Sequence, residues 1–160
     1  MNFSDFMNDD FEGAGFVFFT PEKKILMLQK HNKKWSLVGG HREKGETPLQ
    51  TAKRETKEEI GFLPKGEIID FIKYKKTETN TWCYSFLMKV KEKFRVSLSN
   101  EHVDYKWVSI DSLGNYKISK AVNDMFPLLK KTPLIKGRKL QQQEQIPNPV
   151  FQELLQLQCD

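Results

Sequence analysis

The chain has 160 residues, which suits a single domain with one hydrophobic core. Apolar residues make up 38% of it, and no apolar run approaches the roughly 18 residues of a membrane span, so the sequence excludes an integral membrane protein. The start of the chain is acidic, unlike a signal peptide, and the two cysteines, Cys83 and Cys159, cannot build a disulfide framework. We therefore expect a cytoplasmic protein.

The net charge of +5 indicates a preference for anionic partners. The basic residues occur as scattered pairs and not as one dense arm, so charge alone favours an ordinary lysine-rich surface. A nucleic-acid partner stays open, although no motif indicates one.

Two short apolar runs near the start of the chain, residues 14–19 and 24–30, flank a proline turn and predict a β-hairpin. A third extended piece covers residues 35–38 and ends in two glycines.

A helix is predicted over residues 48–60 because signals mark both of its ends. Thr47 at the N-cap, Pro48 at the first helical position and Gln50 three residues after the cap form a capping box. Gly61 supplies the left-handed residue with which many helices end.

Three further extended segments, at residues 67–74, 81–90 and 104–110, precede a second helix at residues 119–130. Strands and helices do not alternate regularly, so the pattern predicts an α+β fold with a mixed sheet.

The chain is expected to divide near residue 130. Residues 1–130 hold the predicted strands and helices, whereas residues 131–160 form a tail that contains seven of the nine glutamines. The tail is either a mobile polar segment, which its composition slightly favours, or a docking helix over residues 150–157.

Three carboxylates of the first helix, those of Glu55, Glu58 and Glu59, share an arc of roughly 100° around its axis. Like charges at these spacings repel one another, and clustered carboxylates are the ligands that Mg²⁺ and Mn²⁺ prefer. A solvated acidic face balanced by Lys53 and Lys57 explains the helix equally well.

The sequence of the loop before the helix favours the metal-site interpretation over the solvated acidic face. Gly39 and Gly40 let the backbone approach closely, so that carbonyl oxygens can turn toward a cation held by the helix. Glu46 lies just before the cap and adds another carboxylate to the same place.

Residues 40–62 resemble the Nudix box, Gx5Ex7REUxEExGU, where U is a bulky apolar residue. All seven fixed letters are present at the right spacing, and a chance match anywhere in the chain is on the order of one in a million. The chain departs from the family pattern at Thr56, where an aliphatic residue is usual, and at Val38, where many relatives have proline.

The resemblance implies an α/β/α sandwich around a mixed sheet. It also implies hydrolysis of a nucleoside diphosphate linked to another group, with Mg²⁺ or Mn²⁺ as cofactor. Certain residues then match family roles: Glu55, Glu58 and Glu59 as metal-binding carboxylates, the Gly39 carbonyl as backbone ligand, Arg54 as the residue that orients a box glutamate, and Glu46 as the glutamate that steadies the loop and binds metal through water.

The catalytic base is either Glu55 or a glutamate from elsewhere, and Glu101 is the best outside candidate. Many Nudix enzymes have a distal glutamate before a strand that contains a tryptophan such as Trp107. Glu101 is expected to act as a distal metal ligand or assisting base. A solvated loop position is the alternative.

Several further residues are candidates for substrate binding. His41 suits a phosphate contact or, equally, a structural role. His102 suits a base or a substrate contact, although a histidine at such a position is more often a surface residue. Aromatic rings that can stack on a nucleobase are those of Trp35, Trp82 and Tyr84. These aromatic residues are more often part of a core.

The sequence therefore predicts a pyrophosphohydrolase that acts on ADP-ribose or a dinucleoside polyphosphate. Hydrolysis of nucleoside triphosphates, removal of RNA 5′ ends and a non-catalytic nucleotide-sensing module remain alternatives. The expected partner is a small nucleotide substrate and not a membrane. The oligomeric state is open, with a homodimer among the options.

Overall fold

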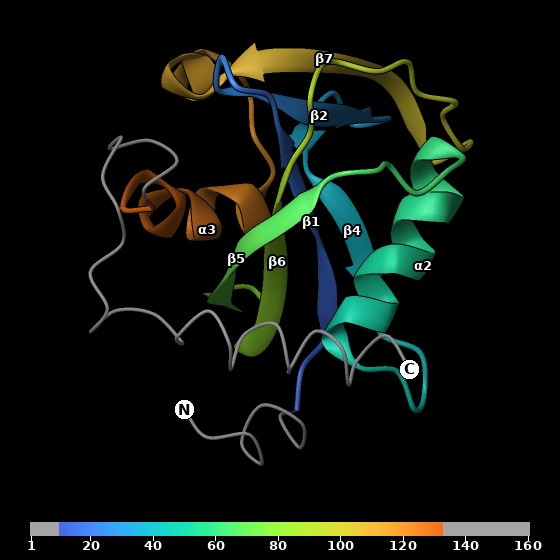
Figure 1. Ribbon diagram of the computed structural model, residues 1–160. Coiled ribbons are helices and arrows are strands. Elements are labelled where there is room, and N and C mark those ends of the chain that lie inside the picture. Colours follow the sequence, from blue (N-terminus) through green and yellow to red (C-terminus); the bar gives the residue numbers. More distant parts are fainter. Residues whose placement is uncertain (1–9, 133–160) are drawn as a thin grey trace.

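A mixed β-sheet lies between two helices in the computed structural model, which describes residues 10–132 (Figure 1). The helices are α2 (Pro48–Ile60) and α3 (Lys120–Lys130), with the 3-10 helix η1 (Ile110–Asn115) before α3. The strands are β1 (Gly13–Phe19), β2 (Lys24–Lys30), β3 (Trp35–Ser36), β4 (Val38–His41), β5 (Glu67–Lys76), β6 (Thr81–Lys89) and β7 (His102–Ser109).

The sheet follows the order β3-β2-β1-β6-β5, with β4 beside β1 and β7 beside β2. Strands β1 and β6 are parallel and the other pairs are antiparallel, so the sheet is mixed, as expected. One edge of β1 pairs with β6, whereas the other pairs with β4 at residues 13–16 and with β2 at Phe19.

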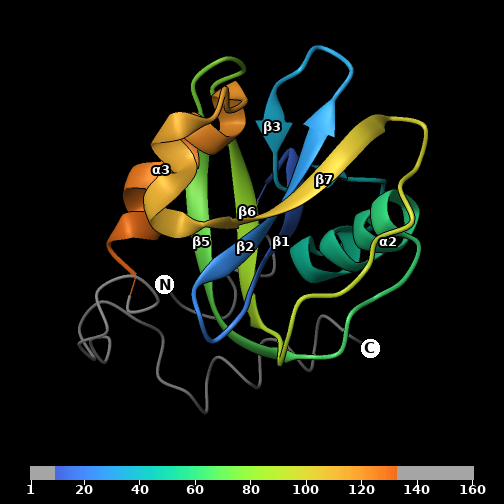
Figure 2. The same cartoon turned by 90° about the horizontal axis from the view of Figure 1, so that it is seen from above.

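The two helices cover opposite faces of the sheet (Figures 1 and 2), because each has an apolar stripe that fills one of two separate cores. Leu49, Ala52 and Ile60 of α2 enter one core, and Val122 and Met125 of α3 enter the other. The predicted α/β/α arrangement is confirmed.

The ends of α2 match the sequence prediction. The Thr47 hydroxyl accepts a hydrogen bond from the Gln50 N–H, and the Thr47 N–H donates to the Gln50 side chain, which completes the capping box. Gly61 has φ 89° and ends the helix in the left-handed conformation. Thr56 is buried, and its hydroxyl donates to the Ala52 carbonyl (2.7 Å), so this departure from the family pattern leaves no unpaired polar atom.

Other boundaries differ modestly from the prediction. The extended piece at residues 35–38 is split at Leu37, so that β3 pairs with β2 and β4 pairs with β1. Ser119 is the N-cap of α3 and not its first residue. The predicted tail lies almost wholly outside the described residues. Within residues 10–132, no helix combines the length and apolar character needed to cross a bilayer.

Candidate active site

The three glutamates on one arc of α2 have different surroundings. The Glu59 side chain is 5% exposed, and its Oε1 accepts a hydrogen bond from the Gly39 N–H (2.6 Å). The Glu55 side chain is 14% exposed and the Glu58 side chain 55% exposed. The arc therefore places one carboxylate inside the fold, one at the rim and one in solvent.

Burial raises the pKa of Glu59 to about 8, although the hydrogen bond from Gly39 lowers it. The nearby charges of Glu55 and Glu101 raise it further. A carboxyl group held this way is mostly neutral near neutral pH unless positive charge is brought to it. Its surroundings thus suit a bound cation.

The Glu55 carboxylate lies directly against the backbone of Gly40. A Cβ on Gly40 would overlap this carboxylate, so the close approach requires glycine. Burial raises the pKa of Glu55, and the ion pair with Arg54 opposes that rise.

Arg54 joins the loop before α2 to the carboxylates on the helix. Its guanidinium donates to both oxygens of Glu46 (2.8 and 3.0 Å), to Glu55 (3.0 Å) and to Glu58 (3.2 Å). It also donates to the His41 carbonyl (2.7 Å). These contacts fix the orientation of Glu55, because a guanidinium offers several donors in a rigid plane.

Glu46 is held mainly by Arg54. The hydrogen bond from the Arg54 guanidinium, together with those from the Glu43 N–H and the Thr51 hydroxyl, lowers the pKa of Glu46 to about 2. The same bonds close the loop onto the start of α2.

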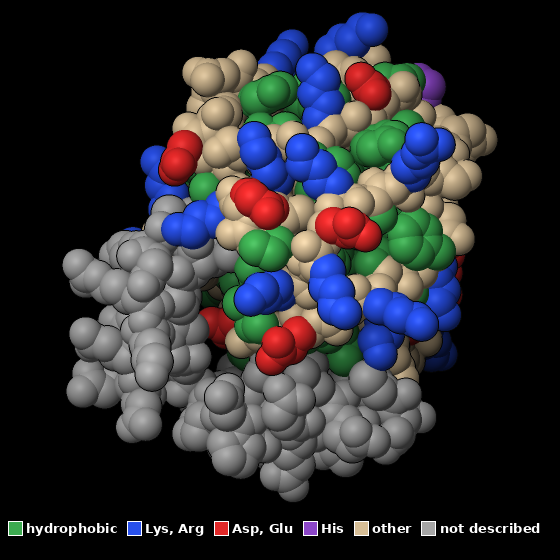
Figure 3. All heavy atoms as spheres, turned by 45° about the horizontal axis from the view of Figure 1, so that its top comes forward, with side chains coloured by type: hydrophobic (Ala, Val, Ile, Leu, Met, Phe, Trp, Pro, Cys, Tyr) green, Lys and Arg blue, Asp and Glu red, His purple; other side chains and the backbone are tan. Residues whose placement is uncertain are grey.

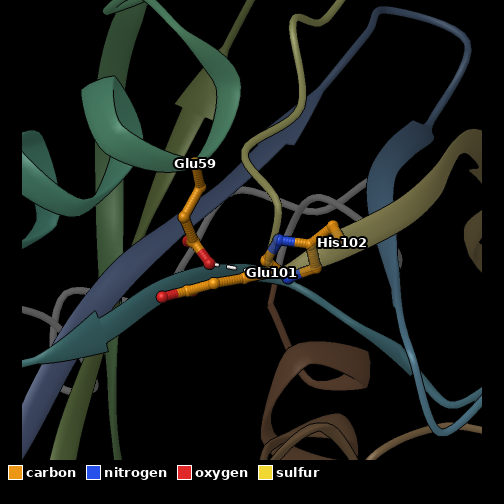
Figure 4. Close-up of side chains that lie close together, drawn as sticks. All are labelled: Glu59, Glu101 and His102. Atoms are coloured by element: carbon orange, nitrogen blue, oxygen red, sulfur yellow. Dashed lines mark ion pairs between the residues drawn. The ribbon is translucent and has the colours of Figure 1, made fainter.

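Glu101 and His102 reach the buried end of this site from the start of β7 (Figure 4). One ligand atom each from Glu59, Glu101 and His102 lies within 4.8 Å of the others. His102 Nε2 is 3.5 Å from Glu59 Oε2. Backbone hydrogen bonds from Ser97 to Ile60 and from Ser99 to Glu59 tie the preceding loop to the end of α2, which brings these distant residues together.

His102 is buried, so it does not occupy the surface position that is more common for such a histidine. It pairs with Lys30 at an irregular point of the β2–β7 ladder, and its ring enters the space beside Glu59. Burial lowers the pKa of His102. Its Nε2 is the ring nitrogen beside Glu59, whereas its Nδ1 is buried with no hydrogen-bond partner among the residues that the structure describes.

A cleft of about 660 Å³ joins these residues to the sheet. Glu55, Glu59, Glu101, Gly39 and His41 line it. Cleft residues that sequence reasoning missed are Glu12, Lys30, His31, Tyr74 and Lys76. They come from three segments that lie far apart in the chain, just before β1, at the end of β2 and on β5, so no local spacing signals their meeting.

The aromatic candidates are separated by the fold. Tyr84 lines the cleft but is 1% exposed. Trp35 is buried in the core on the α3 side, packs edge-on against Tyr116 and does not line the cleft. Trp82 is 41% exposed outside the cleft lining, with the Lys73 and Lys75 ammonium groups over its ring. Of the three aromatic candidates, Tyr84 therefore lines this cleft and the two tryptophans do not.

The chain is similar in sequence to known proteins. The sequence model of the NUDIX domain matches residues 11–131. A pig bis(5′-nucleosyl)-tetraphosphatase (asymmetrical) is 34% identical over 114 residues, which are 62% of this chain and 75% of that protein. A dihydroneopterin triphosphate diphosphatase from Haemophilus influenzae is 32% identical over 112 residues, which are 58% of this chain and 70% of that protein.

The fold has solved counterparts as well. The crystal structure of a Nudix hydrolase from M. smegmatis superposes with a TM-score of 0.68 at 18% identity, covering 82% of this chain and 89% of that one. Enzymes of this family need divalent metals, and the acidic cluster on α2 and β7 offers ligands for one. From the box, the fold and these relatives, the chain belongs to the Nudix family and is a hydrolase that acts on pyrophosphate bonds.

Proposed function

We propose that the protein cleaves a dinucleoside polyphosphate asymmetrically, with Mg²⁺ or Mn²⁺ as cofactor. The name of the pig relative supports this substrate class. The observation that carries the proposal is the meeting of Glu55, Glu59 and Glu101 at one cleft of about 660 Å³, a size usual for small-molecule sites. ADP-ribose, dihydroneopterin triphosphate, nucleoside triphosphates and RNA 5′ ends are the competing substrates.

The residues present suit a divalent cation. Carboxylate oxygens of Glu55, Glu58, Glu59 and Glu101 would hold it, with the Gly39 carbonyl as backbone ligand and Glu46 contributing through water. The raised pKa of buried Glu59, together with the ligand atoms of Glu59, Glu101 and His102 that lie within 4.8 Å of one another, supports a cation at this place. When bound, such a cation neutralises phosphate oxygens and makes water more acidic.

The chain's own groups then orient the reaction. Arg54 fixes Glu55 through its guanidinium, and Gly40 lets that carboxylate lie against the backbone. Glu101 is exposed beside Glu59, so its carboxylate is free to take a proton from the attacking water. We assign Glu55 as a ligand and Glu101 as the assisting base, with the reverse assignment as the alternative.

Two other functions have weaker support. A nucleotide sensor would be expected to lack box carboxylates, whereas all of them are present here. A nucleic-acid-binding protein would be expected to show a dense basic patch, whereas the face in Figure 3 carries Lys and Arg side chains interspersed with Asp and Glu. The proposed cytoplasmic location is compatible with each of these functions.

The proposal is tested by comparing kcat/KM for a dinucleoside tetraphosphate with that for each competing substrate, in Mg²⁺ and in Mn²⁺. Asymmetric cleavage adds one water and yields one nucleoside triphosphate and one nucleoside monophosphate. Hydrolysis in ¹⁸O-labelled water identifies the attacked phosphorus, because the label enters only one product. We expect the dinucleoside tetraphosphate to have the highest kcat/KM. A higher value for a triphosphate or ADP-ribose would refute the substrate class while leaving the reaction type intact.

A further inference from the structure

Glu12 lies at the cleft, outside the Nudix box, and its carboxylate gathers four side chains from distant parts of the chain. Oε1 accepts from Lys76 Nζ (3.3 Å) and lies 3.0 Å from His41 Nε2. Oε2 accepts from the hydroxyls of Thr79 (2.8 Å) and Thr81. The Glu12 side chain is 19% exposed, so these partners replace most of its contact with water.

The backbone around Glu12 is fixed as firmly as the side chain. The Glu12 N–H donates to the Trp82 carbonyl (2.8 Å), and the Glu12 carbonyl accepts from the Arg42 N–H (2.9 Å). The carboxylate therefore stands at a set position between the loop after β4 and the hairpin that joins β5 to β6.

The two nitrogen groups that Glu12 holds, on Lys76 and His41, both line the cleft, as Glu12 itself does. Lys76 is the last residue of β5, and its side chain is 21% exposed. Phosphate groups of a substrate in this cleft would meet a carboxylate and its basic partners together. A carboxylate alone would repel a polyphosphate, so a carboxylate at this cleft must have a favourable effect on binding that offsets the repulsion.

We propose that Glu12 is a positioning residue, which holds the Lys76 ammonium and the His41 imidazole at the cleft so that they meet the phosphate chain of the substrate. This inference rests on the proposed function, because it assumes a polyphosphate in the cleft. An untethered lysine has a flexible four-carbon stem and loses that freedom on binding, whereas a tethered lysine has already lost it.

A purely structural role for Glu12 is the competing explanation, since its threonine contacts also close the β5–β6 hairpin. Asp124 of α3 provides a matched control for this structural explanation. Asp124 accepts from the Thr77 N–H (2.9 Å) and the Thr77 hydroxyl (3.1 Å), so it clamps the same hairpin, but it does not line the cleft. Glu78, exposed on that hairpin, controls for the lost charge.

The test compares full-length Glu12→Gln, Lys76→Met and the double variant with Asp124→Asn and Glu78→Gln. KM and kcat are measured with a dinucleoside tetraphosphate. Calorimetry measures the binding of bis(methylene)triphosphonate, a tripolyphosphate analogue whose P–C–P bridges resist hydrolysis. We expect Glu12→Gln and Lys76→Met each to raise KM and weaken analogue binding about tenfold, with kcat nearly unchanged. The double variant should resemble Lys76→Met, because Glu12 acts largely through Lys76.

Three results would overturn the inference: an unchanged or lower KM in Glu12→Gln, additive effects in the double variant, or an equal rise of KM in Asp124→Asn. If Glu12→Gln does not fold, an unchanged KM in Lys76→Met overturns it instead. If the wild-type protein does not cleave the dinucleoside tetraphosphate, the proposed substrate fails. Analogue binding then still decides the role of Glu12.

Discussion

Replacing Glu59 by glutamine should stabilise the metal-free protein, and the gain should grow with pH. Glutamine keeps an acceptor for the Gly39 N–H but cannot ionise. In the wild-type protein the pKa of Glu59 is raised from its ordinary 4.5 to about 8 by burial. Between these values the unfolded chain releases a proton that the folded chain keeps, so the free energy of unfolding falls as pH rises.

The size of this effect follows from the interval between the two pKa values. Each pH unit within it costs the wild-type protein about 1.4 kcal/mol, so the variant should gain up to about 3 kcal/mol near neutral pH and at most about 5 kcal/mol at alkaline pH. Below the ordinary glutamate pKa, residue 59 is neutral in both proteins, folded and unfolded, so the variant should gain no stability there.

Urea unfolding with EDTA present, followed by tryptophan fluorescence from about pH 5 to about pH 9, measures the gain directly. Glu58→Gln is the matched control, because it makes the same change on the same helix at a side chain that is 55% exposed. Adding Mg²⁺ or Mn²⁺ should shrink the gain, since the cation binds the ionised carboxylate, and turnover of Glu59→Gln should fall by orders of magnitude. A gain independent of pH, or near-normal turnover, would refute the reasoning.

The remaining predictions concern the base and the tail. Glu101→Gln should lower kcat by roughly 10²–10⁴-fold if Glu101 is the base, and less if it only supports the metal. Glu55→Gln should show the opposite ranking if Glu55 is the base, and the variant whose pH–rate profile loses its acidic limb identifies it. If neither variant changes rate or metal affinity, both assignments are wrong. A chain ending at residue 132 should keep its melting temperature and its activity, because the box and every described strand and helix precede that point. A large loss of melting temperature, or of dimer mass, would show instead that residues 150–157 dock.

Local signals in the sequence were sufficient for the elements that carry the chemistry. The cap at Thr47 and the terminal Gly61 place both ends of α2 correctly, because capping depends on residues within a few positions of each other. The box spacing predicts the family for a similar reason, since its glutamates and glycines lie on one loop and one helix. The first hairpin was also predictable, from two apolar runs around a short turn.

Only the tertiary structure decided how the site residues differ from one another. Glu58 and Glu59 are neighbours with the same chemistry, yet one is in solvent and the other accepts a hydrogen bond from Gly39 on β4. His102 is buried because its strand pairs with β2, which no local pattern reports. Glu12 and Lys76 lie 64 positions apart and meet only because the folded sheet brings the residue before β1 and the end of β5 to one cleft. Burial and long-range pairing are properties of the whole chain, so the sequence identifies which groups are available and the fold determines which of them lie close enough to act together.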